Sequence, residues 1–393
     1  MQKAIHYTFV VSFITFLIGV LLVTAFRTKE PYYYYENRAT MIRPHLSIPS
    51  VLDGSFFDDF EKYLVDHGAG RTTLIRLHTY ADMAMRPVVN DVVITKEALL
   101  PFRYYEGVSE LKIDQEAKDM ARTQKKLADQ VQAYGGDYLY VAVPNQYASY
   151  EEAYPWYLNN RSMYTRLELQ YFEEAMAKEQ VPFLDMKDIF LEKGTLREFS
   201  SSVDNHYSLF GAYLTYTNLI HRFNEMTTYQ LEVATEDDVK FIEMPMNYLG
   251  ANARKLLGLW QSDEKLIKAE FTPDIAFDRY NYGNQVDSNV YSMPTSDRQD
   301  LIYGFYMGGD MSEVMIDTKR PDLPTILVYG DSFTNAVEVV LYYSFDKMYS
   351  IDRRYYKEMS VSAYIDEIKP DYVVCIRDYE ALLNPSYNGN PFE

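Results

Sequence analysis

A serine that follows an apolar run is the residue of this chain with the clearest chemical potential. The run 325–329 (Thr-Ile-Leu-Val-Tyr) predicts a buried strand, Gly330-Asp331-Ser332 interrupts it, and residues 335–341 can begin a helix. A strand-to-helix turn of this kind holds the serine hydroxyl out of the sheet, and the first N–H groups of the helix can stabilise an oxyanion. Ser332 is therefore a candidate nucleophile, and Asp331 is expected to brace the turn or cap the helix.

A serine nucleophile needs a base, and all 6 histidines of the chain precede Ser332. His206 lies in the segment Val-Asp-Asn-His-Tyr, two residues after Asp204. In an extended loop residues i and i+2 point the same way, so Asp204 can fix the tautomer of the His206 imidazole. His206 can then take the proton of Ser332. His67 precedes a glycine that would end a helix and His78 falls in a helical run, so we expect both to be structural.

The same residues carry a family resemblance. Gly-Asp-Ser-Phe at 330–333 resembles the first motif of the SGNH hydrolase and acyltransferase superfamily, whose ordinary members place Asp-x-x-His after the serine. Here Asp-x-His comes first, an order that resembles the polysaccharide O-acetylation proteins of the alginate type (AlgJ and AlgX) and the related DHHW proteins. Further matches are Asp204 to Tyr207 for their Asp-x-His-Trp motif, Gly211-Ala212, Glu36-Asn37-Arg38, Tyr306-Met307-Gly308-Gly309 and Ile351 to Tyr356. The departures are Asn205, Tyr207 in place of Trp, and Gly330 where DHHW proteins often have Lys; the resemblance covers residues 36–384.

The resemblance implies an SGNH-like enzyme outside the cytoplasm, on the extracellular face or in the periplasm. Ser332 would take an acetyl group and pass it to a hydroxyl of an exopolysaccharide or cell-wall polymer. A membrane-bound O-acyltransferase is the implied partner that supplies the acetyl group. A carbohydrate acetyl esterase has the same triad and uses water as the acceptor, and a non-catalytic polysaccharide-binding scaffold would keep the fold without needing Ser332. Both alternatives stay open from the residues alone. Besides the Ser332 N–H, the candidate oxyanion and substrate contacts are Gly309, Asn145, Asp331 and Tyr207.

The composition limits the partners and cofactors. The formal net charge is −19, whereas nucleic-acid binding needs a basic face, so nucleic acid is excluded and general adhesion to anionic lipid is disfavoured. The sequence has no phosphate-binding loop, dinucleotide fingerprint, His-x-x-x-His or Cys-x-x-Cys, and so indicates no cofactor and no metal. The single cysteine, Cys375, lies in an apolar run expected to be a buried strand. It can form no internal disulfide and is a poor candidate nucleophile.

The N-terminus has the composition of a membrane span. Residues 4–26 contain no Lys, Arg, Asp or Glu, and basic residues flank both ends. The stretch is long enough to cross a bilayer, although Val23-Thr24-Ala25 also satisfies the small-residue rule for signal cleavage. We expect an uncleaved signal anchor over 1–27, a connector over 28–52, an extracytoplasmic catalytic domain over 53–385 and a tail over 386–393.

Strand-like and helix-like segments alternate through most of the chain. Strands are expected at 138–143, 181–185, 325–329, 346–351 and 372–376, and helices at 53–85, 114–134, 161–179, 209–226, 335–341 and 359–368. The alternation predicts an α/β fold with a doubly wound parallel sheet of the SGNH or flavodoxin type, in which ligands bind at the carboxyl ends of the strands. Asn145 and Ser332 follow two of these ends. Residues 230–315 are rich in Tyr, Asp and Asn and predict an insertion of short strands and loops.

Overall fold

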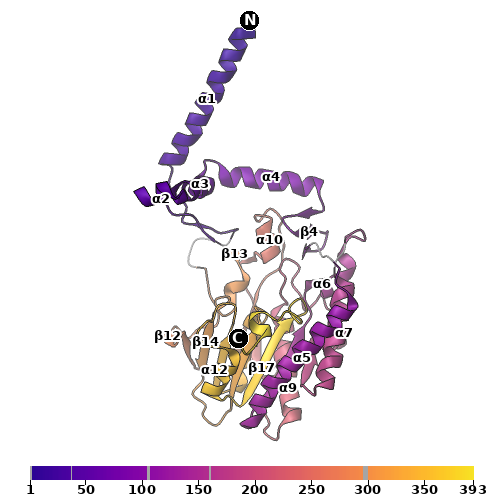
Figure 1. The fold of residues 1–393 in the computed structure, drawn as a ribbon. Coiled ribbons are helices and arrows are strands. Elements are labelled where there is room, and N and C mark those ends of the chain that lie inside the picture. The colour runs from indigo at the N-terminus through magenta and orange to yellow at the C-terminus, as the bar shows by residue number, and fades with distance from the viewer. Residues whose placement is uncertain (1, 37, 104–106, 159–160, 295–299) are drawn as a thin grey trace. The chain divides into compact units, whose positions relative to one another are not determined.

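The protein is described here from a computed structural model (Figure 1). It describes residues 2–36, 38–103, 107–158, 161–294 and 300–393, so Asn37 of the Glu-Asn-Arg match lies outside the described residues. Contacts divide the chain into two compact units, one of residues 1–90 with 254–260 and one of residues 91–253 with 261–393. The domain limits expected from the sequence stay predictions.

The smaller unit is mostly helical. Its elements are α1 (Gln2–Phe26), β1 (Tyr32–Tyr33), β2 (Arg38–Ala39), α2 (Ile48–Leu52), α3 (Ser55–His67), α4 (Arg71–Met85) and β3 (Val88–Val89). Among the described residues one stretch, Ile5–Phe26 of α1, is long and apolar enough to cross a membrane, with a mean hydropathy of 2.6. The helical stretch expected over 53–85 is divided into two helices: α3 ends before Gly68, the glycine that the sequence analysis expected to end a helix, and Gly70, with a φ of +74° that L side chains rarely adopt, precedes α4.

The larger unit is built on an eight-stranded sheet of order β12-β11-β14-β16-β15-β17-β6-β7. Its strands are β6 (Asp137–Val143), β7 (Phe183–Asp185), β11 (Asp278–Asn281), β12 (Asn284–Val286), β14 (Glu313–Asp317), β15 (Thr325–Gly330), β16 (Lys347–Ile351) and β17 (Tyr372–Asp378). The five strands from β16 to β7 are parallel, which confirms the predicted α/β sheet. The other three are antiparallel: β11 and β12 come from the predicted insertion, and β14 overlaps its end, so these strands widen the sheet.

Helices cover both faces of this sheet. One core joins α5 (Glu110–Ala133), α7 (Ser162–Lys178) and α12 (Val361–Ile368) to alternate residues of β6, β15 and β17 (Figure 1). The strand residues that alternate with these point to the other face of the sheet, toward α9 (Leu209–Met226) and α11 (Thr334–Leu341). There the ring centroids of Phe223 and Tyr372 are 4.6 Å apart. Cys375 is fully buried in the first core, and burial raises the pKa of its thiol to about 12. The thiol therefore stays protonated at neutral pH.

Shorter elements complete the chain. They are β4 (Val92–Ile94), β5 (Leu99–Pro101), α6 (Gln146–Ser149), α8 (Met186–Lys193), β8 (Val239–Glu243), β9 (Asn247–Tyr248), α10 (Ala251–Lys255), β10 (Ile267–Phe271) and β13 (Asp300–Leu301). β8 and β10 form an antiparallel pair, and β9 pairs in parallel with β13. All four belong to the predicted insertion, which is therefore rich in short strands and loops as expected.

The end of β15 requires a glycine. Gly330 is its last residue and pairs with Ile376 of β17. A Cβ on Gly330 would lie 2.0 Å from the carbonyl oxygen of Ile376, a distance that real Cβ atoms essentially never show. Glycine therefore allows β15 to continue beside β17 up to the turn, and the turn places Ser332 at the carboxyl end of the parallel strands.

Candidate active site

Three side chains that the sequence predicts to act together meet at the carboxyl end of β15. His206 Nε2 lies 2.6 Å from Ser332 Oγ, and His206 Nδ1 lies 2.6 Å from Asp204 Oδ1. Asp204 and His206 are buried, with 1% and 7% of their surface exposed, whereas Ser332 is partly exposed. With its proton on Nδ1 the imidazole donates to the carboxylate and presents a lone pair to the hydroxyl. A carboxylate–imidazole–hydroxyl chain in this order can activate the serine as a nucleophile.

The Asp204 carboxylate is held by backbone N–H groups as well as by the imidazole. Oδ1 also accepts the His206 N–H at 3.2 Å, and Oδ2 accepts the Ala251 N–H at 2.6 Å. Burial by itself raises the pKa of Asp204, but the His206 charge, the imidazole hydrogen bond and the Ala251 N–H outweigh it and hold the pKa at about 2. The carboxylate is therefore ionised at neutral pH and keeps accepting the Nδ1 proton.

Gly250 brings the Ala251 N–H to this carboxylate. A Cβ at position 250 would lie 2.3 Å from the Val203 carbonyl oxygen and 2.9 Å from Asp204 Cβ. The two segments can approach this closely only because residue 250 has no side chain. Sequence reasoning missed Gly250, since an isolated loop glycine far along the chain from Asp204 carries no recognisable signal.

Tyr303 is a second residue that sequence reasoning missed. Its ring lies parallel to the His206 imidazole, with centroids 3.6 Å apart and an interplanar angle of 3°. Its hydroxyl donates to the Ser332 carbonyl oxygen at 3.0 Å. Tyr303 therefore contacts both the base and the nucleophile segment. The chain has 38 tyrosines, so residue type alone could not single this one out.

Tyr207 and Asp331 hold the turn that carries the serine. The Tyr207 hydroxyl donates to the Phe333 carbonyl oxygen at 2.6 Å, which ties the histidine loop to the residue after Ser332. Asp331 Oδ1 accepts the Phe333 N–H and Oδ2 accepts the Asp378 N–H, both at 3.0 Å. Asp331 thus braces the turn, as the sequence led us to expect. The Tyr207 hydroxyl is used on the backbone, so we assign this residue to positioning.

Asn145 follows the end of β6 as expected, and its side chain contacts α6 and the end of β17. Its side chain accepts the Ala148 N–H and so caps α6, and Nδ2 donates to Asp378 Oδ1 at 3.2 Å. Burial, followed by the Asp331 charge, raises the pKa of Asp378 well above its ordinary value. Asn145 and Asp331 therefore both contact the partly buried Asp378, Asn145 at its carboxyl group and Asp331 at its backbone N–H. A role for Asn145 in oxyanion binding stays a prediction.

Gly309 belongs to a loop with fixed backbone contacts. Its φ is +90°, and its N–H donates to the Tyr306 carbonyl oxygen at 3.0 Å, so this N–H would have to leave that partner to bind an oxyanion. The buried Arg279 donates from Nη2 to the Met307 carbonyl oxygen and from Nη1 to that of Asn289, each at 2.6 Å. These bonds fix the loop that follows Tyr303. The oxyanion role of Gly309 stays a prediction.

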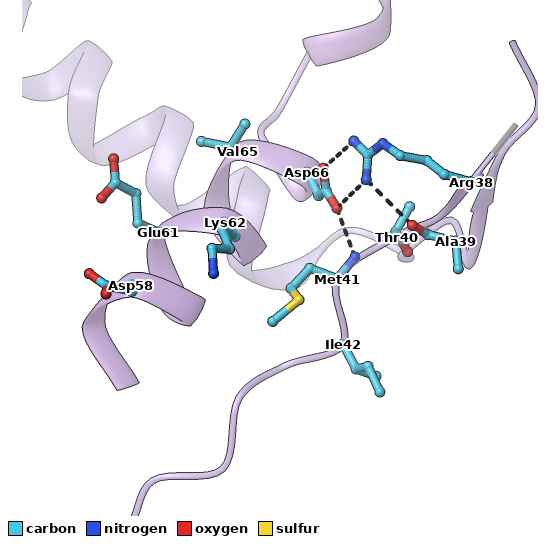
Figure 2. Close-up of a pocket in the computed structure, with 10 residues that line it drawn as sticks. All are labelled: Arg38, Ala39, Thr40, Met41, Ile42, Asp58, Glu61, Lys62, Val65 and Asp66. Atoms are coloured by element: carbon cyan, nitrogen blue, oxygen red, sulfur yellow. Dashed lines mark hydrogen bonds and ion pairs between the residues drawn. The ribbon is translucent and has the colours of Figure 1, made fainter. Parts of the chain in front are cut away.

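A separate groove of about 620 Å³ lies in the smaller unit, and no member of the Asp–His–Ser set lines it (Figure 2). It is lined by Arg38, Ala39, Thr40, Met41, Ile42, Asp58, Glu61, Lys62, Val65 and Asp66. The Arg38 guanidinium binds both Asp66 oxygens at 2.9 and 2.6 Å and holds the pKa of that carboxyl at about 2. His67 Nε2 bonds the Met41 carbonyl oxygen at 2.9 Å, so His67 has the structural role that the sequence predicts. These contacts fasten residues 38–41 to α3.

Comparisons with known proteins support the fold. No protein-family model and no curated protein sequence matches the chain. Among solved structures, Bacillus cereus PatB1 with a sulfonyl adduct aligns with a TM-score of 0.64 at 16% identity, over 77% of this chain and 97% of PatB1. A DHHW family protein from Eubacterium siraeum aligns with a TM-score of 0.55 at 16% identity, over 78% of this chain and 97% of that protein. The O-acetyltransferase domain of Pseudomonas putida AlgJ is more distant, with a TM-score of 0.45 at 15% identity, over 75% and 92% of the two chains. The larger part of the chain therefore has the fold of PatB1 and the DHHW protein, which confirms the predicted resemblance at the level of fold.

Proposed function

We propose that this protein is an extracytoplasmic O-acetyltransferase that moves an acetyl group through Ser332 to a hydroxyl of an exopolysaccharide or cell-wall polymer. The observation that carries the proposal is the hydrogen-bonded chain from Asp204 through His206 to Ser332, with both distances at 2.6 Å. The fold shared with PatB1, which is known with a sulfonyl adduct, and with a DHHW protein supports it.

The first half of the reaction loads the serine. Ser332 Oγ attacks the acetyl carbonyl carbon of the donor while its proton passes to His206 Nε2. Asp204 accepts the Nδ1 proton throughout and stabilises the imidazolium that forms. The Ser332 N–H is the candidate donor to the oxyanion of the tetrahedral intermediate. The bond to the leaving group then breaks, and the leaving group departs with the proton from Nε2.

The second half unloads it. A sugar hydroxyl gives its proton to His206 Nε2 while its oxygen attacks the carbonyl carbon of the acetyl-serine. The bond between that carbon and Ser332 Oγ breaks, and Oγ takes the proton back from Nε2. Atoms and protons balance, because the acetyl group moves from donor to sugar and the donor's leaving group receives one proton. The same steps with water in place of the sugar would make the protein an esterase.

We further propose that α1 stays attached as a single membrane span and that a membrane-bound O-acyltransferase supplies the acetyl group. The uncharged stretch over 4–26 and its helical form in α1 support the span. The supply of acetyl groups from the membrane rests on the resemblance to the alginate-type proteins. It would place donor and catalytic unit on the same membrane.

Acetyl transfer to sugars tests the proposed function. The purified full-length chain is incubated with an aryl acetate, with and without oligosaccharide acceptors, and the sugars are analysed by mass spectrometry. Ser332→Ala is the matched variant, since it removes one oxygen from a partly exposed side chain. We expect acetyl release and acetylated sugar from the unaltered chain and a loss of at least ~10³-fold in the variant.

The other outcomes separate the alternatives. Release of acetate with every acceptor left unmodified would make the protein an esterase. Equal turnover by Ser332→Ala and the unaltered chain would rule out the serine mechanism. A folded, unaltered chain that releases no acetate and forms no acetyl-enzyme would favour the scaffold.

A further inference from the structure

Helix α4 exposes an apolar stripe. Leu74, Leu77, Ala81, Ala84 and Met85 recur at helical spacing and fall on one side of the helix. All five are exposed, and Leu74, Leu77 and Met85 have 64%, 61% and 71% of their surface accessible. In a soluble helix a stripe of this kind normally faces the core.

The opposite side of α4 packs against the protein and carries polar groups beside the half-buried Ile75 and Met83. Thr79 and Asp82 retain only 3% and 9% of their surface. Arg76 Nη1 donates to the Leu257 carbonyl oxygen at 2.8 Å, and Arg71 pairs with Glu36 at 2.5 Å. The buried side of the helix is therefore mixed, whereas its continuous apolar stripe faces outward. This arrangement leaves the stripe exposed within the described part of the chain.

The excess of exposed apolar groups is confined to this region. Outside α1, residues 27–90 expose about as many large apolar side chains as the whole of the larger unit, among the residues that the structure describes. In α2, for example, Ile48 and Leu52 have 78% and 82% of their surface accessible. The larger unit has the surface of a soluble protein, whereas the region next to α1 does not.

The turn before α4 is fastened to the last turn of α1. The Ala69 N–H donates to Thr24 Oγ1 at 3.0 Å, and Arg27 Nη1 donates to the Gly68 carbonyl oxygen at 3.3 Å. Thr24 belongs to the candidate span Ile5–Phe26. In Figure 1, α3 and α4 follow one another across the end of α1. Helix α4 therefore begins at the level where the span would leave the bilayer.

We propose that α4 lies in the membrane interface, with its stripe of Leu74, Leu77, Ala81, Ala84 and Met85 toward the acyl chains. The inference rests on the proposed attachment of α1 as a span. Its 15 residues would extend about 22 Å along the membrane surface, and Tyr80 beside the stripe is of a type enriched at such interfaces. Lipid is the apolar medium that surrounds a single span at this depth, which favours a bilayer over a protein partner as the occupant.

Spin-label accessibility in the full-length chain tests the inference. Cys375 is fully buried, so a label goes to an introduced cysteine without altering the native one. Leu77→Cys and Met85→Cys report on the stripe, Leu17→Cys on α1, and Lys126→Cys on an exposed position of α5. Each variant is reconstituted in nanodiscs of phosphatidylcholine and phosphatidylglycerol, and power saturation compares collisions with oxygen, which partitions into lipid, and with a water-soluble nickel chelate.

We expect the labels at positions 17, 77 and 85 to collide more with oxygen than with nickel. The labels at 77 and 85 should lie at a shallower depth in the bilayer than the label at 17. The label at position 126 should show the reverse preference. A lipid-exposed Leu17 with Leu77 and Met85 in water would overturn the inference and leave the anchor intact. Low collision with both reagents at Leu77 and Met85 would also overturn it, because another protein surface would then cover the stripe. A water-exposed Leu17 would overturn the anchor, and the inference with it.

Discussion

Replacing Asp204 with asparagine should leave the loop in place and remove most of the activity. The change exchanges one carboxylate oxygen for an NH₂ group of nearly the same size. Both oxygens are in use, Oδ1 by His206 Nδ1 at 2.6 Å and by the His206 N–H at 3.2 Å, and Oδ2 by the Ala251 N–H at 2.6 Å. The asparagine side chain has only one oxygen, so it can accept hydrogen bonds either from His206 or from Ala251, but not from both.

The geometry favours the inactive orientation. With its oxygen toward His206 the NH₂ group would face the Ala251 N–H at 2.6 Å, and two opposed donors cost about 1–3 kcal/mol. With its oxygen toward Ala251 the NH₂ group donates to Nδ1, and the opposed His206 N–H is farther away at 3.2 Å. That orientation moves the imidazole proton to Nε2, which can then no longer accept the proton of Ser332. We expect kcat to fall by ~10³–10⁴, as wrong-tautomer variants of serine triads do, or about 4–5.5 kcal/mol in activation free energy.

The assay is aryl acetate hydrolysis by Asp204→Asn, the unaltered chain and Asp188→Asn, an exposed carboxylate on α8 that serves as the control. Thermal melts establish that all three are folded. Raising the pH should not restore the activity of the variant, because its defect is a proton on the wrong imidazole nitrogen. An Asp204→Asn variant that is folded and retains a tenth or more of the wild-type kcat would show that Asp204 does not control the tautomer of His206.

Three further predictions follow from contacts of the same site. In Gly250→Ala the new Cβ would lie 2.3 Å from the Val203 carbonyl oxygen, so the variant should be less stable by ~1–3 kcal/mol in thermal melts. Its kcat should fall by about tenfold or more, because Asp204 is displaced. Unchanged kinetics would contradict this prediction. Tyr303→Phe keeps an aromatic ring on the His206 imidazole and should lower kcat only slightly. Tyr303→Leu should lower kcat about tenfold, because it removes the aromatic face that stabilises the imidazolium. Equal rates for the two variants would show that the stacking does not matter. Burial and the Asp331 charge raise the pKa of Asp378 in the folded protein. The contribution of Asp378 to the free energy of unfolding is therefore complete below its pKa in the unfolded chain, near 3.8, and is lost as the pH rises through its pKa in the folded protein. The Tm of Asp378→Asn should therefore exceed that of the unaltered chain at alkaline pH, and parallel Tm curves would argue against it.

The sequence was sufficient to predict most of the local elements and which three side chains would meet, Ser332, His206 and Asp204. Alternation of apolar runs and amphipathic helices predicts β6, β15, β16 and β17, because buried parallel strands must be apolar on both faces. The pairing of Ser332 with His206 follows from motif and chain order, and both hydrogen bonds are present in the structure. The catalytic role of the set is a proposal that the assays above test.

The contacts that position these groups could not be read from the sequence. Gly250 and Tyr303 act through approaches between segments far apart in the chain, which no local periodicity encodes. Residues 278–286 were expected only as part of an insertion, yet β11 and β12 extend the main sheet, because short polar strands give a weak signal of which partner they join. The outward orientation of the α4 stripe also needs the structure, since periodicity shows an apolar stripe but not which way it faces.

The most direct test of the central claim is to identify the acetylated residue. The full-length chain is mixed with an aryl acetate, quenched in acid within the first turnover and digested, and the peptide that contains residue 332 is analysed by mass spectrometry. We expect one acetyl group on Ser332, which is lost on addition of an acceptor sugar and is absent in His206→Ala. An acetyl group on another residue only, or an unmodified Ser332 peptide from a preparation that releases acetate, would contradict this expectation.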